Sequence, residues 1–346
     1  MSMRYKLLGR SGLRVSEICL GAMGFGEEAG WGSNKEESRQ TFEAYAGAGG
    51  NFIDTANTYT QGTSEKYVGE FMGASRDRYV LATKYTIGSD KDDPNGSGNN
   101  RKNMMQAVEA SLKRLNTDRI DLYWLHVWDF LTPVDEVMRG LDDLVRSGKV
   151  LYIGVSDTPA WVVSRANMLA ELRGWSQFAA LQVEYSLIER TVERDLLPMA
   201  RALDLAVTPW APLAGGVLSG KFNKGADPKT VTRRVMTGQR LSERSLRIAR
   251  EVEKVAEECG RSSAQVAINW VRQQKGLIIP IVGARTLAQT RDSLACLEFS
   301  LSEAQLKRLD EVSKFDMGFP YEFYQRNGRM LALGNAADLI DNHRPG

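Results

Sequence analysis

Eight short apolar runs recur along the chain, separated by longer segments of mixed polarity. Most runs are uniformly apolar rather than alternating, which is typical of strands buried on both faces of a parallel sheet. The predicted strands span residues 17–21, 51–55, 79–84, 121–126, 151–156, 179–185, 205–210 and 277–283.

The segments between these runs have helical periodicity and recognisable ends. In segment 132–149, Pro133 lies near the first turn and Gly148 just past the last, as helix ends prefer. The other predicted helices span residues 35–50, 242–260, 262–276 and 301–314. This alternation predicts an α/β fold, a (β/α)8 TIM barrel that occupies residues 1–346 as a single domain. A doubly wound sheet is the alternative, because the pattern does not show whether the sheet closes.

Three stretches interrupt the alternation, at residues 87–102, 214–240 and 317–346. Each either follows a strand or can fold over the strand ends. Long irregular loops in a compact domain are usually functional or disordered. We expect long loops at the carboxyl face of the barrel, and the aromatic tail 317–346 is a candidate substrate loop.

Composition narrows the class of protein. The chain has 346 residues and a net charge of +2, which gives no electrostatic reason to expect nucleic acid as a partner. No apolar run is long enough to span a membrane, and the start of the chain lacks a signal-peptide core. Three scattered cysteines fit a reducing compartment, and two histidines are too few for a histidine-rich metal site. We expect a cytoplasmic protein that binds a small molecule and no metal; a homo-oligomer is compatible with the sequence.

Polar side chains gather at the carboxyl ends of three consecutive predicted strands. Asp54, Lys84 and His126 end or nearly end their runs, and Tyr59 follows Asp54 by five residues. In parallel barrels the catalytic groups lie at these strand ends. We therefore expect the four residues, here called the tetrad, to meet at the mouth of the barrel.

The tetrad has the composition of a proton donor. A free phenol has a pKa of about 10, and a nearby cation lowers it. Lys84 is the predicted cation, Asp54 its counter-ion, and Tyr59 the general acid towards a developing alkoxide, while His126 orients the substrate oxygen. The structural alternative is an ion pair between Lys84 and Asp54, with Tyr59 covering the rim and His126 packed in the core.

Two glycine-rich segments resemble nucleotide motifs only in part. The segment 21–26 has the wrong spacing for a Rossmann site. The segment 215–222 matches the start of a phosphate loop, but Phe222 stands where a magnesium-binding hydroxyl is needed, so we reject an ATPase. Its glycine amides and Lys221 still suit a pyrophosphate.

The chain resembles the aldo-keto reductase superfamily over nearly its whole length, from Tyr5 to about Ser313. The segments that carry the resemblance are FIDTANTY, the strand end ATK, DLYWLHVWD, IGVSD, LQVEYSL, TPWAPLAGGVLSGK and IPIVGARTLAQTRDS. The layout is closest to the branch that includes bacterial reductases and potassium-channel β subunits. The resemblance implies a barrel with an N-terminal β-hairpin cap, a cofactor bound across its mouth, and the tetrad roles given above.

The resemblance also implies a set of cofactor-binding residues. Ser156, Asp157 and Gln182 would face the nicotinamide carboxamide, and Trp210 would stack on the ring. The predicted pyrophosphate segment consists of Ala211, Pro212, Leu213, Ala214, Gly215 and Lys221. The predicted adenosine end consists of Gly283, Arg285, Gln289, Asp292 and Ser293.

Some of these positions depart from the common pattern of the family. Asp157 stands where Asn is usual, Ala211 replaces a frequent Ser, and Ser293 replaces a frequent Asn. Arg285 and Arg234 are candidates for contact with a 2′-phosphate, since guanidinium groups suit phosphate. They favour NADPH as the cofactor, with NADH as the alternative.

The predicted function is NAD(P)H-dependent reduction of aldehydes or ketones to alcohols. The predicted substrate pocket is apolar, and it consists of Met23, Phe25, Trp31, Tyr85 and Trp128, with Phe319 and Tyr321 as further candidates. A redox-sensing regulatory subunit with weak reductase activity is the alternative. A barrel hydrolase or aldolase that uses Lys84 as a Schiff base is disfavoured, because a neighbouring carboxylate keeps that lysine charged.

Overall fold

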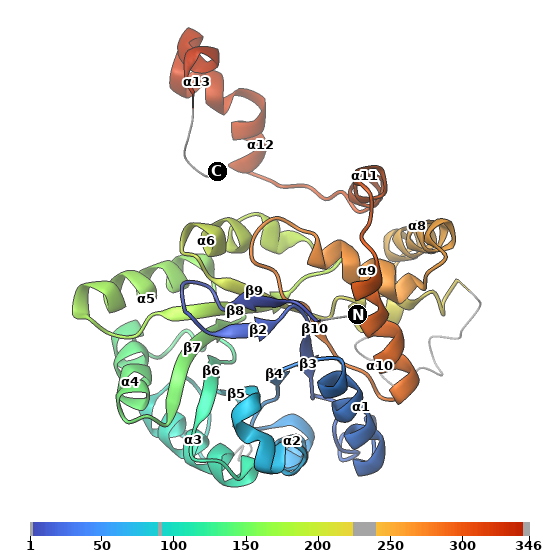
Figure 1. Ribbon diagram of the computed structural model, residues 1–346. Helices are drawn as coiled ribbons and strands as arrows, with labels where there is room; N and C mark the ends of the chain where they lie inside the picture. Colours follow the sequence, from blue (N-terminus) through green and yellow to red (C-terminus); the bar gives the residue numbers. More distant parts are fainter. Residues whose placement is uncertain (1–2, 89–91, 224–239, 342–346) are drawn as a thin grey trace. The chain divides into compact units, whose positions relative to one another are not determined.

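The computed structural model describes residues 3–88, 92–223 and 240–341 of the chain. It divides into two compact units, residues 1–313 and residues 314–346, and each is described by itself. In the first unit, Figure 1 shows central strands with helices around them.

Among the described residues, eight parallel strands form one sheet in the order β10-β3-β4-β5-β6-β7-β8-β9. They are β3 (Cys19–Gly21), β4 (Phe52–Asp54), β5 (Val80–Tyr85), β6 (Ile120–Leu125), β7 (Val150–Ser156), β8 (Phe178–Glu184), β9 (Ala206–Trp210) and β10 (Ile281–Val282). A parallel bridge between Val207 and Ile278 brings the two ends of the sheet together. The predicted (β/α)8 barrel is confirmed, and the doubly wound alternative is wrong because the ends of its sheet would not meet.

The helices of this unit follow the strands and pack outside them (Figure 1). They are α1 (Lys35–Gly47), α2 (Thr63–Met72), α3 (Arg101–Leu115), α4 (Val134–Arg146), α5 (Ala160–Arg173), α6 (Leu196–Ala202), α8 (Glu243–Cys259), α9 (Ser263–Arg272), α10 (Leu287–Leu294) and α11 (Glu303–Val312). Several begin at a polar cap that the sequence supplies. For example, the side chain of Asn34 accepts from the backbone N–H of Glu37, and the carboxylate of Glu37 accepts from the backbone N–H of Asn34.

The predicted N-terminal hairpin is confirmed as β1 (Tyr5–Leu7) paired with β2 (Arg14–Ser16). It covers the amino ends of β8 and β9, because Leu8 is fully buried in one apolar cluster with Ala179 and Ala206. Gly9 has φ +55°, and a Cβ there would lie 2.3 Å from the carbonyl oxygen of Ala179. The close approach of hairpin and barrel therefore requires glycine at this position.

Side chains of the strands fill the barrel interior. Trp124 on β6 is fully buried, and its register partner on β7 is Gly154. A Cβ on Gly154 would lie 2.4 Å from the Trp124 ring, so the indole occupies the space of a side chain on the neighbouring strand. The interior is thus a packed core, and chemistry is confined to the strand ends.

The second unit contains short helical segments, among them α12 (Tyr321–Phe323) and α13 (Arg329–Leu333). Its aromatic side chains contact one another, with the Phe319 and Phe323 ring centroids 6.4 Å apart. The role predicted for this tail as a substrate loop stays a prediction.

Candidate active site

The carboxyl ends of β4, β5 and β6 bring three members of the tetrad together. Asp54 is the last residue of β4, Lys84 the penultimate residue of β5, and His126 directly follows β6. These strands are neighbours in the sheet, with Asp54 paired to Ala82 and Lys84 paired to Trp124. Parallel pairing alone therefore aligns the carboxylate, the ammonium and the imidazole at one edge.

The ammonium of Lys84 is fully buried and has defined partners. It forms an ion pair with Asp54 and donates a second hydrogen bond to the carbonyl oxygen of Thr55 at 2.8 Å. The other carboxylate oxygen of Asp54 accepts from Nε2 of Gln182 at 2.9 Å. Both oxygens of Asp54 are engaged, which is the arrangement that a buried ion pair needs to persist.

Tyr59 lies between Lys84 and His126. Nζ of Lys84 is 4.6 Å from the centroid of the phenol ring, and the His126 ring lies edge-on at a centroid distance of 5.9 Å. The following residues, Thr60 and Gln61, have φ of 45° and 55°. Left-handed backbone at two non-glycine residues is strained, and the Thr60 hydroxyl holds it by donating to the carbonyl oxygen of Phe25 at 2.6 Å.

The pKa of Tyr59 is raised above that of a free phenol, chiefly because the phenol is buried; Asp54 raises it further and the charge of Lys84 opposes the rise. Our expectation of a lowered phenol pKa is wrong for this structure, because burial outweighs the cation. Burial would also lower the pKa of Lys84, but Asp54 and Tyr59 raise it overall. Near neutral pH the phenol is protonated and the lysine charged, so Tyr59 holds a proton beside a cation.

His126 is a neutral imidazole in this site. Burial and then the charge of Lys84 lower the pKa of His126 to about 3. Its Nδ1 is buried without a hydrogen-bond partner among the described residues, and its backbone N–H donates to the Thr86 hydroxyl at 3.3 Å. A neutral ring can orient a carbonyl by a hydrogen bond but does not supply the proton.

The residues predicted to face the carboxamide lie on or directly after β7 and on β8, and Trp210, predicted to stack on the nicotinamide ring, ends β9. Oγ of Ser156 is buried with no partner in the described part of the chain, whereas Gln182 bonds Asp54. Nε1 of Trp210 donates to Asp157 at 3.2 Å. Burial raises the pKa of Asp157 to about 6, and the negative charge of Glu184 adds to the rise.

The predicted pyrophosphate segment forms a glycine-rich turn after β9. Ala211, Ala214, Gly215 and Gly216 all have positive φ, between 48° and 91°. A Cβ on Gly216 would lie 2.8 Å from Nζ of Lys221, so the lysine head group rests against the turn. Pro212 and Leu213 lie within the same turn, so the segment combines left-handed glycine backbone with a cation beside it.

The predicted adenosine end follows β10. Ser293 is buried, and Asp292 accepts from the Ser262 hydroxyl at 3.0 Å and from Gln265 at 2.7 Å, which ties α10 to α9. Gly283 is exposed, and Oε1 of Gln289 accepts from the backbone N–H of Arg285 at 3.0 Å. Arg234 lies outside the described residues.

The sequence model of the aldo/keto reductase family matches residues 17–314 of the chain. The chain belongs to this family. It is 40% identical to norsolorinic acid reductase B of Dothistroma septosporum, over 93% of this chain and 84% of the relative. It is 39% identical to the aryl-alcohol dehydrogenase [NADP(+)] of Phanerodontia chrysosporium, over 96% of this chain and 89% of the relative.

A putative aryl-alcohol dehydrogenase of Saccharomyces cerevisiae is 36% identical, over 92% of this chain and 88% of the relative. These comparisons confirm the predicted family of oxidoreductases. The relatives named here are fungal reductases and dehydrogenases, whereas the sequence layout pointed towards a bacterial branch.

Two residues predicted for the substrate pocket of this aldo/keto reductase are in the packed core instead. Tyr85 is fully buried and stacks on Tyr123 with centroids 5.4 Å apart, and Phe25 is fully buried and contacts Phe71 at 6.1 Å. Neither side chain lines an open pocket here. Trp128 is 8% exposed, and only Met23 and Trp31 are partly exposed. Phe319 and Tyr321 belong to the second unit.

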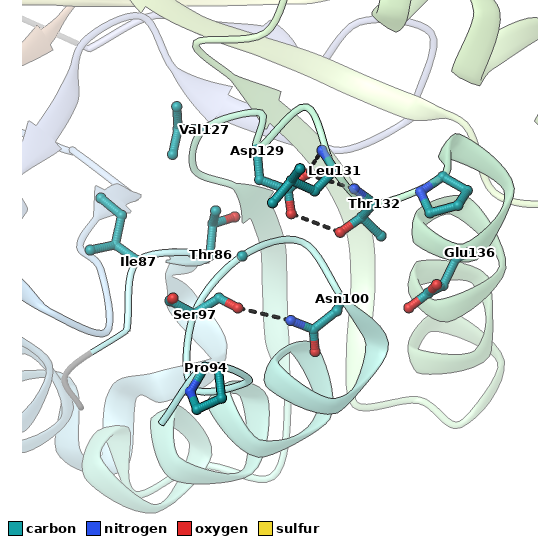
Figure 2. A pocket seen from close by; sticks show the side chains of 12 residues that line it. Thr86, Ile87, Pro94, Ser97, Asn100, Val127, Asp129, Leu131, Thr132 and Glu136 are labelled. Atoms are coloured by element: carbon teal, nitrogen blue, oxygen red, sulfur yellow. Dashed lines mark hydrogen bonds between the residues drawn. The ribbon is translucent and has the colours of Figure 1, made fainter. Parts of the chain in front are cut away.

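An open pocket of about 530 Å³ lies elsewhere at this edge of the aldo/keto reductase barrel, between the loops that follow β5 and β6 (Figure 2). Sequence reasoning missed it. Its lining residues are Thr86, Ile87, Pro94, Ser97, Gly98, Asn100, Val127, Asp129, Leu131, Thr132, Pro133 and Glu136. Sequence reasoning also missed Arg240, whose guanidinium pairs with Glu184 at 2.6 Å and lies 5.8 Å from the centroid of the Trp210 ring.

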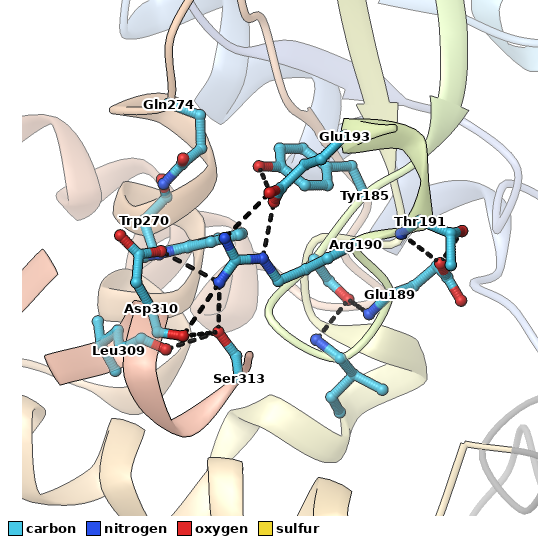
Figure 3. Close-up of polar contacts among 12 residues, drawn as sticks. Tyr185, Glu189, Arg190, Thr191, Glu193, Trp270, Gln274, Leu309, Asp310 and Ser313 are labelled. Atoms are coloured by element: carbon cyan, nitrogen blue, oxygen red, sulfur yellow. Dashed lines mark hydrogen bonds and ion pairs between the residues drawn. The ribbon is translucent and has the colours of Figure 1, made fainter. Parts of the chain in front are cut away.

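A polar cluster around Arg190 ties the last barrel helix to the segment after β8 (Figure 3). Arg190 bonds Glu193 at 2.7 Å, Asp310 at 3.2 Å and the Ser313 hydroxyl at 2.7 Å. Trp270 donates to the same aspartate at 3.1 Å. Each polar group of this cluster is engaged, so its role is to fix the end of the barrel.

Within the residues that the structure describes, no group of three or more metal-ligating side chains occurs, and none of the helices combines the length and apolarity needed to cross a bilayer.

Proposed function

We propose that this aldo/keto reductase uses NADPH to reduce aromatic carbonyl compounds to alcohols, with Tyr59 as the general acid. The observation that carries the proposal is the buried Lys84 ammonium, held by Asp54 and lying 4.6 Å from the Tyr59 ring. Two relatives support the proposal: one is an aryl-alcohol dehydrogenase [NADP(+)], which supports the cofactor and the aromatic class, and the other is a norsolorinic acid reductase, which supports reduction.

The residues present fit a nicotinamide dinucleotide. The unpartnered hydroxyl of Ser156 suits a carboxamide, and the turn at Gly216 with the Lys221 ammonium suits a pyrophosphate. Trp210 would lie against the nicotinamide ring, and Arg285 and Arg234 are the proposed 2′-phosphate contacts. When bound, NADPH would supply the hydride that the carbonyl carbon accepts and would be oxidised to NADP⁺.

Each member of the tetrad then has one task. Tyr59 gives its proton to the carbonyl oxygen as negative charge develops there, and a C–H and an O–H bond replace the π bond of the carbonyl. Lys84 stabilises the phenolate that remains, and Asp54 keeps the lysine charged and in place. His126, as a neutral imidazole, orients the oxygen.

The complete tetrad supports catalysis rather than the alternative role of a redox-sensing subunit. A subunit that only senses cofactor needs no general acid. The carboxylate of Asp157, near the proposed carboxamide site, leaves all four members of the tetrad in place. We therefore keep Asp157 as a residue that modulates cofactor binding.

Binding and turnover test this proposal directly. NADPH and NADH are titrated separately while tryptophan fluorescence is followed, and oxidation of NADPH is then measured with benzaldehyde. We expect saturable quenching, tighter binding of NADPH than of NADH, and aldehyde-dependent loss of NADPH. Trp210→Phe, the matched control, should lose most of the quenching. No saturable change together with no aldehyde-dependent oxidation would contradict the proposal.

A further inference from the structure

Tyr59 is followed by a turn in which the backbone takes the unusual left-handed conformation. Between β4 and α2, φ is 45° at Thr60, 55° at Gln61 and 88° at Gly62. Residues other than glycine adopt this conformation singly and rarely, because Cβ then approaches the following carbonyl oxygen. A β-branched threonine is especially disfavoured there. Thr60 therefore keeps its conformation only because the surrounding structure imposes it.

The hydroxyl of Thr60 connects this turn to its surroundings. The residue is 7% exposed, and its Oγ1 donates to the carbonyl oxygen of Phe25 at 2.6 Å. The same oxygen accepts from the backbone N–H of Ser64 at 3.1 Å, in the first turn of α2. The N-cap residue of α2 is Gly62, which has no side chain for capping, so the Thr60 hydroxyl satisfies one of the open N–H groups of the helix. One hydroxyl thus joins the loop after β3, the turn and the helix.

The start of α2 is itself fixed to the strand end that carries Asp54. Oγ of Ser64 donates to the carbonyl oxygen of Ala22 at 2.7 Å and is hydrogen-bonded to the Thr55 hydroxyl at 2.7 Å. The backbone N–H of Ala22 donates in turn to the carbonyl oxygen of Asp54 at 2.8 Å. The turn therefore lies between two fixed points, the end of β4 and the first turn of α2.

The side chain whose direction depends on this turn is that of Tyr59. Asp54 and Lys84 are directed by the pleat of their strands, whereas Tyr59 lies beyond the end of β4. Its phenol ring lies 4.6 Å from Nζ of Lys84 and edge-on to His126 at 5.9 Å, measured to the ring centroid. If Thr60 relaxed to a right-handed conformation, the chain would leave Tyr59 in another direction. Because β4 and α2 are both held, the phenol would be displaced.

We propose that Thr60 is a positioning residue for carbonyl reduction: its hydroxyl holds the left-handed turn that directs the Tyr59 phenol towards the substrate oxygen. The inference rests on the proposed function and adds a residue that acts through Tyr59. Proton transfer requires the phenol oxygen within hydrogen-bond distance of its acceptor, and a misplacement of about 1 Å can cost about a hundredfold in rate. Loss of the hydroxyl should therefore slow the chemical step and leave the affinity for NADPH unchanged.

The test removes the hydroxyl of Thr60 and keeps the shape of the side chain. Thr60→Val leaves the carbonyl of Phe25 and the N–H of Ser64 without their partner, whereas Thr60→Ser keeps the hydroxyl. Single-turnover reduction of benzaldehyde at saturating NADPH should fall about twentyfold in Thr60→Val and stay within about twofold of the wild type in Thr60→Ser. The affinity of both variants for NADPH, from tryptophan fluorescence, should equal that of the wild type.

Thr117→Val is the matched control. The Thr117 hydroxyl also donates to a carbonyl oxygen, that of Arg119 at 3.2 Å, and accepts from an N–H, Nε of Arg76 at 3.1 Å. It precedes β6, at the amino ends of the strands, so this variant loses the same kinds of hydrogen bond away from the tetrad. Its free energy of unfolding should fall, and its single-turnover rate should equal that of the wild type.

A glycine variant keeps the proposal testable if Thr60→Val does not fold. Thr60→Gly adopts the left-handed backbone without strain but lacks the hydroxyl that holds it. Its single-turnover rate should fall about fivefold, because the turn is then accessible but no longer fixed.

The position of the phenol can be followed without any substrate. Because the Tyr59 ring lies edge-on to His126, its displacement changes the ring-current shift of the His126 imidazole signals in NMR. The chain has only two histidines, so His343→Gln assigns these signals. They should move in Thr60→Val and stay in place in Thr60→Ser and Thr117→Val.

A wild-type rate in Thr60→Val, or unmoved His126 signals in that variant, would overturn the positioning role. Equal losses of rate in Thr60→Val and Thr60→Ser would overturn it as well, because the hydroxyl would not be the cause. Absence of NADPH-dependent reduction by the wild type would instead overturn the proposed function. The His126 signals would then still decide whether Thr60 holds Tyr59 in place.

Discussion

The neutrality of His126 has a consequence for stability that can be measured. The unfolded chain presents an ordinary imidazole with a pKa of about 6.5, whereas burial lowers the pKa of His126 in the folded protein to about 3. As the pH falls below 6.5, His126 becomes protonated in the unfolded chain but stays neutral in the folded protein. Stability is therefore constant above about pH 6.5 and is lost as the pH falls towards 3.

The size of the effect follows from the displaced pKa. At pH 5 the solution is about 1.5 units below the pKa of the unfolded imidazole, and each unit corresponds to about 1.4 kcal/mol. The folded protein should thus lose about 2 kcal/mol from this residue between pH 7.5 and pH 5. Asp157 acts in the opposite direction, since its raised pKa of about 6 favours the folded state as pH falls. The wild type and a His126→Gln variant both contain Asp157, so the contribution of Asp157 to the pH dependence of stability cancels when the two are compared.

The assay is urea unfolding of the wild type and of His126→Gln at pH 7.5 and pH 5. The wild type should lose about 2 kcal/mol more than the variant over this interval. Because the chain has only two histidines, imidazole NMR signals give the pKa directly, and His343→Gln assigns the second signal. An imidazole of His126 that titrates near pH 6.5, or equal pH sensitivity of both proteins, would refute the reasoning.

Two further perturbations test the surroundings of the site. Asp157, whose pKa is about 6, should ionise between pH 5 and pH 8 and thereby raise the affinity for NADP⁺ relative to NADPH about fivefold, because only the oxidised nicotinamide is cationic. Fluorescence titrations of Asp157→Asn should show no such change with pH. An equal change in the variant would contradict this role of Asp157. Arg190→Met should cost about 3 kcal/mol in urea unfolding, since it removes a guanidinium that is 11% exposed and leaves the partly exposed Glu193 and Asp310 without their cation. Arg326→Met, which breaks an exposed pair, should cost less than about 0.5 kcal/mol, and equal losses would assign no special role to Arg190.

The sequence predicted the parts of the site that strand geometry determines. Asp54, Lys84 and His126 end neighbouring strands, so parallel pairing places them together whatever the loops do. Tyr85 shows how far this rule extends. Successive side chains of a strand face opposite sides, so with Lys84 directed inward Tyr85 must face the helices, where it stacks on Tyr123. The strand period contained this information, although our prediction of the pocket did not use it.

Features that depend on side-chain contacts across loops were not predictable. The segment 87–102 reads as a polar loop, yet Asn99 within it is fully buried and joins two loops 28 residues apart. A buried asparagine and an exposed one look alike in a single sequence. The direction of the Tyr59 pKa shift was not predictable from the sequence either, because only the three-dimensional structure shows whether burial or the charge of Lys84 dominates. The left-handed backbone of Thr60 has no sequence signal, since β-branched residues disfavour it.

The claim that Tyr59 is the general acid is tested most directly by Tyr59→Phe, which removes one hydroxyl and keeps the ring. NADPH binding, followed by tryptophan fluorescence, should stay within about twofold of the wild type, because Tyr59 is not among the proposed cofactor residues. Carbonyl reduction in a single turnover should fall by at least about a hundredfold, the usual contribution of a positioned general acid. Reduction at the wild-type rate by a variant that binds NADPH normally would contradict the assignment of Tyr59 as the proton donor.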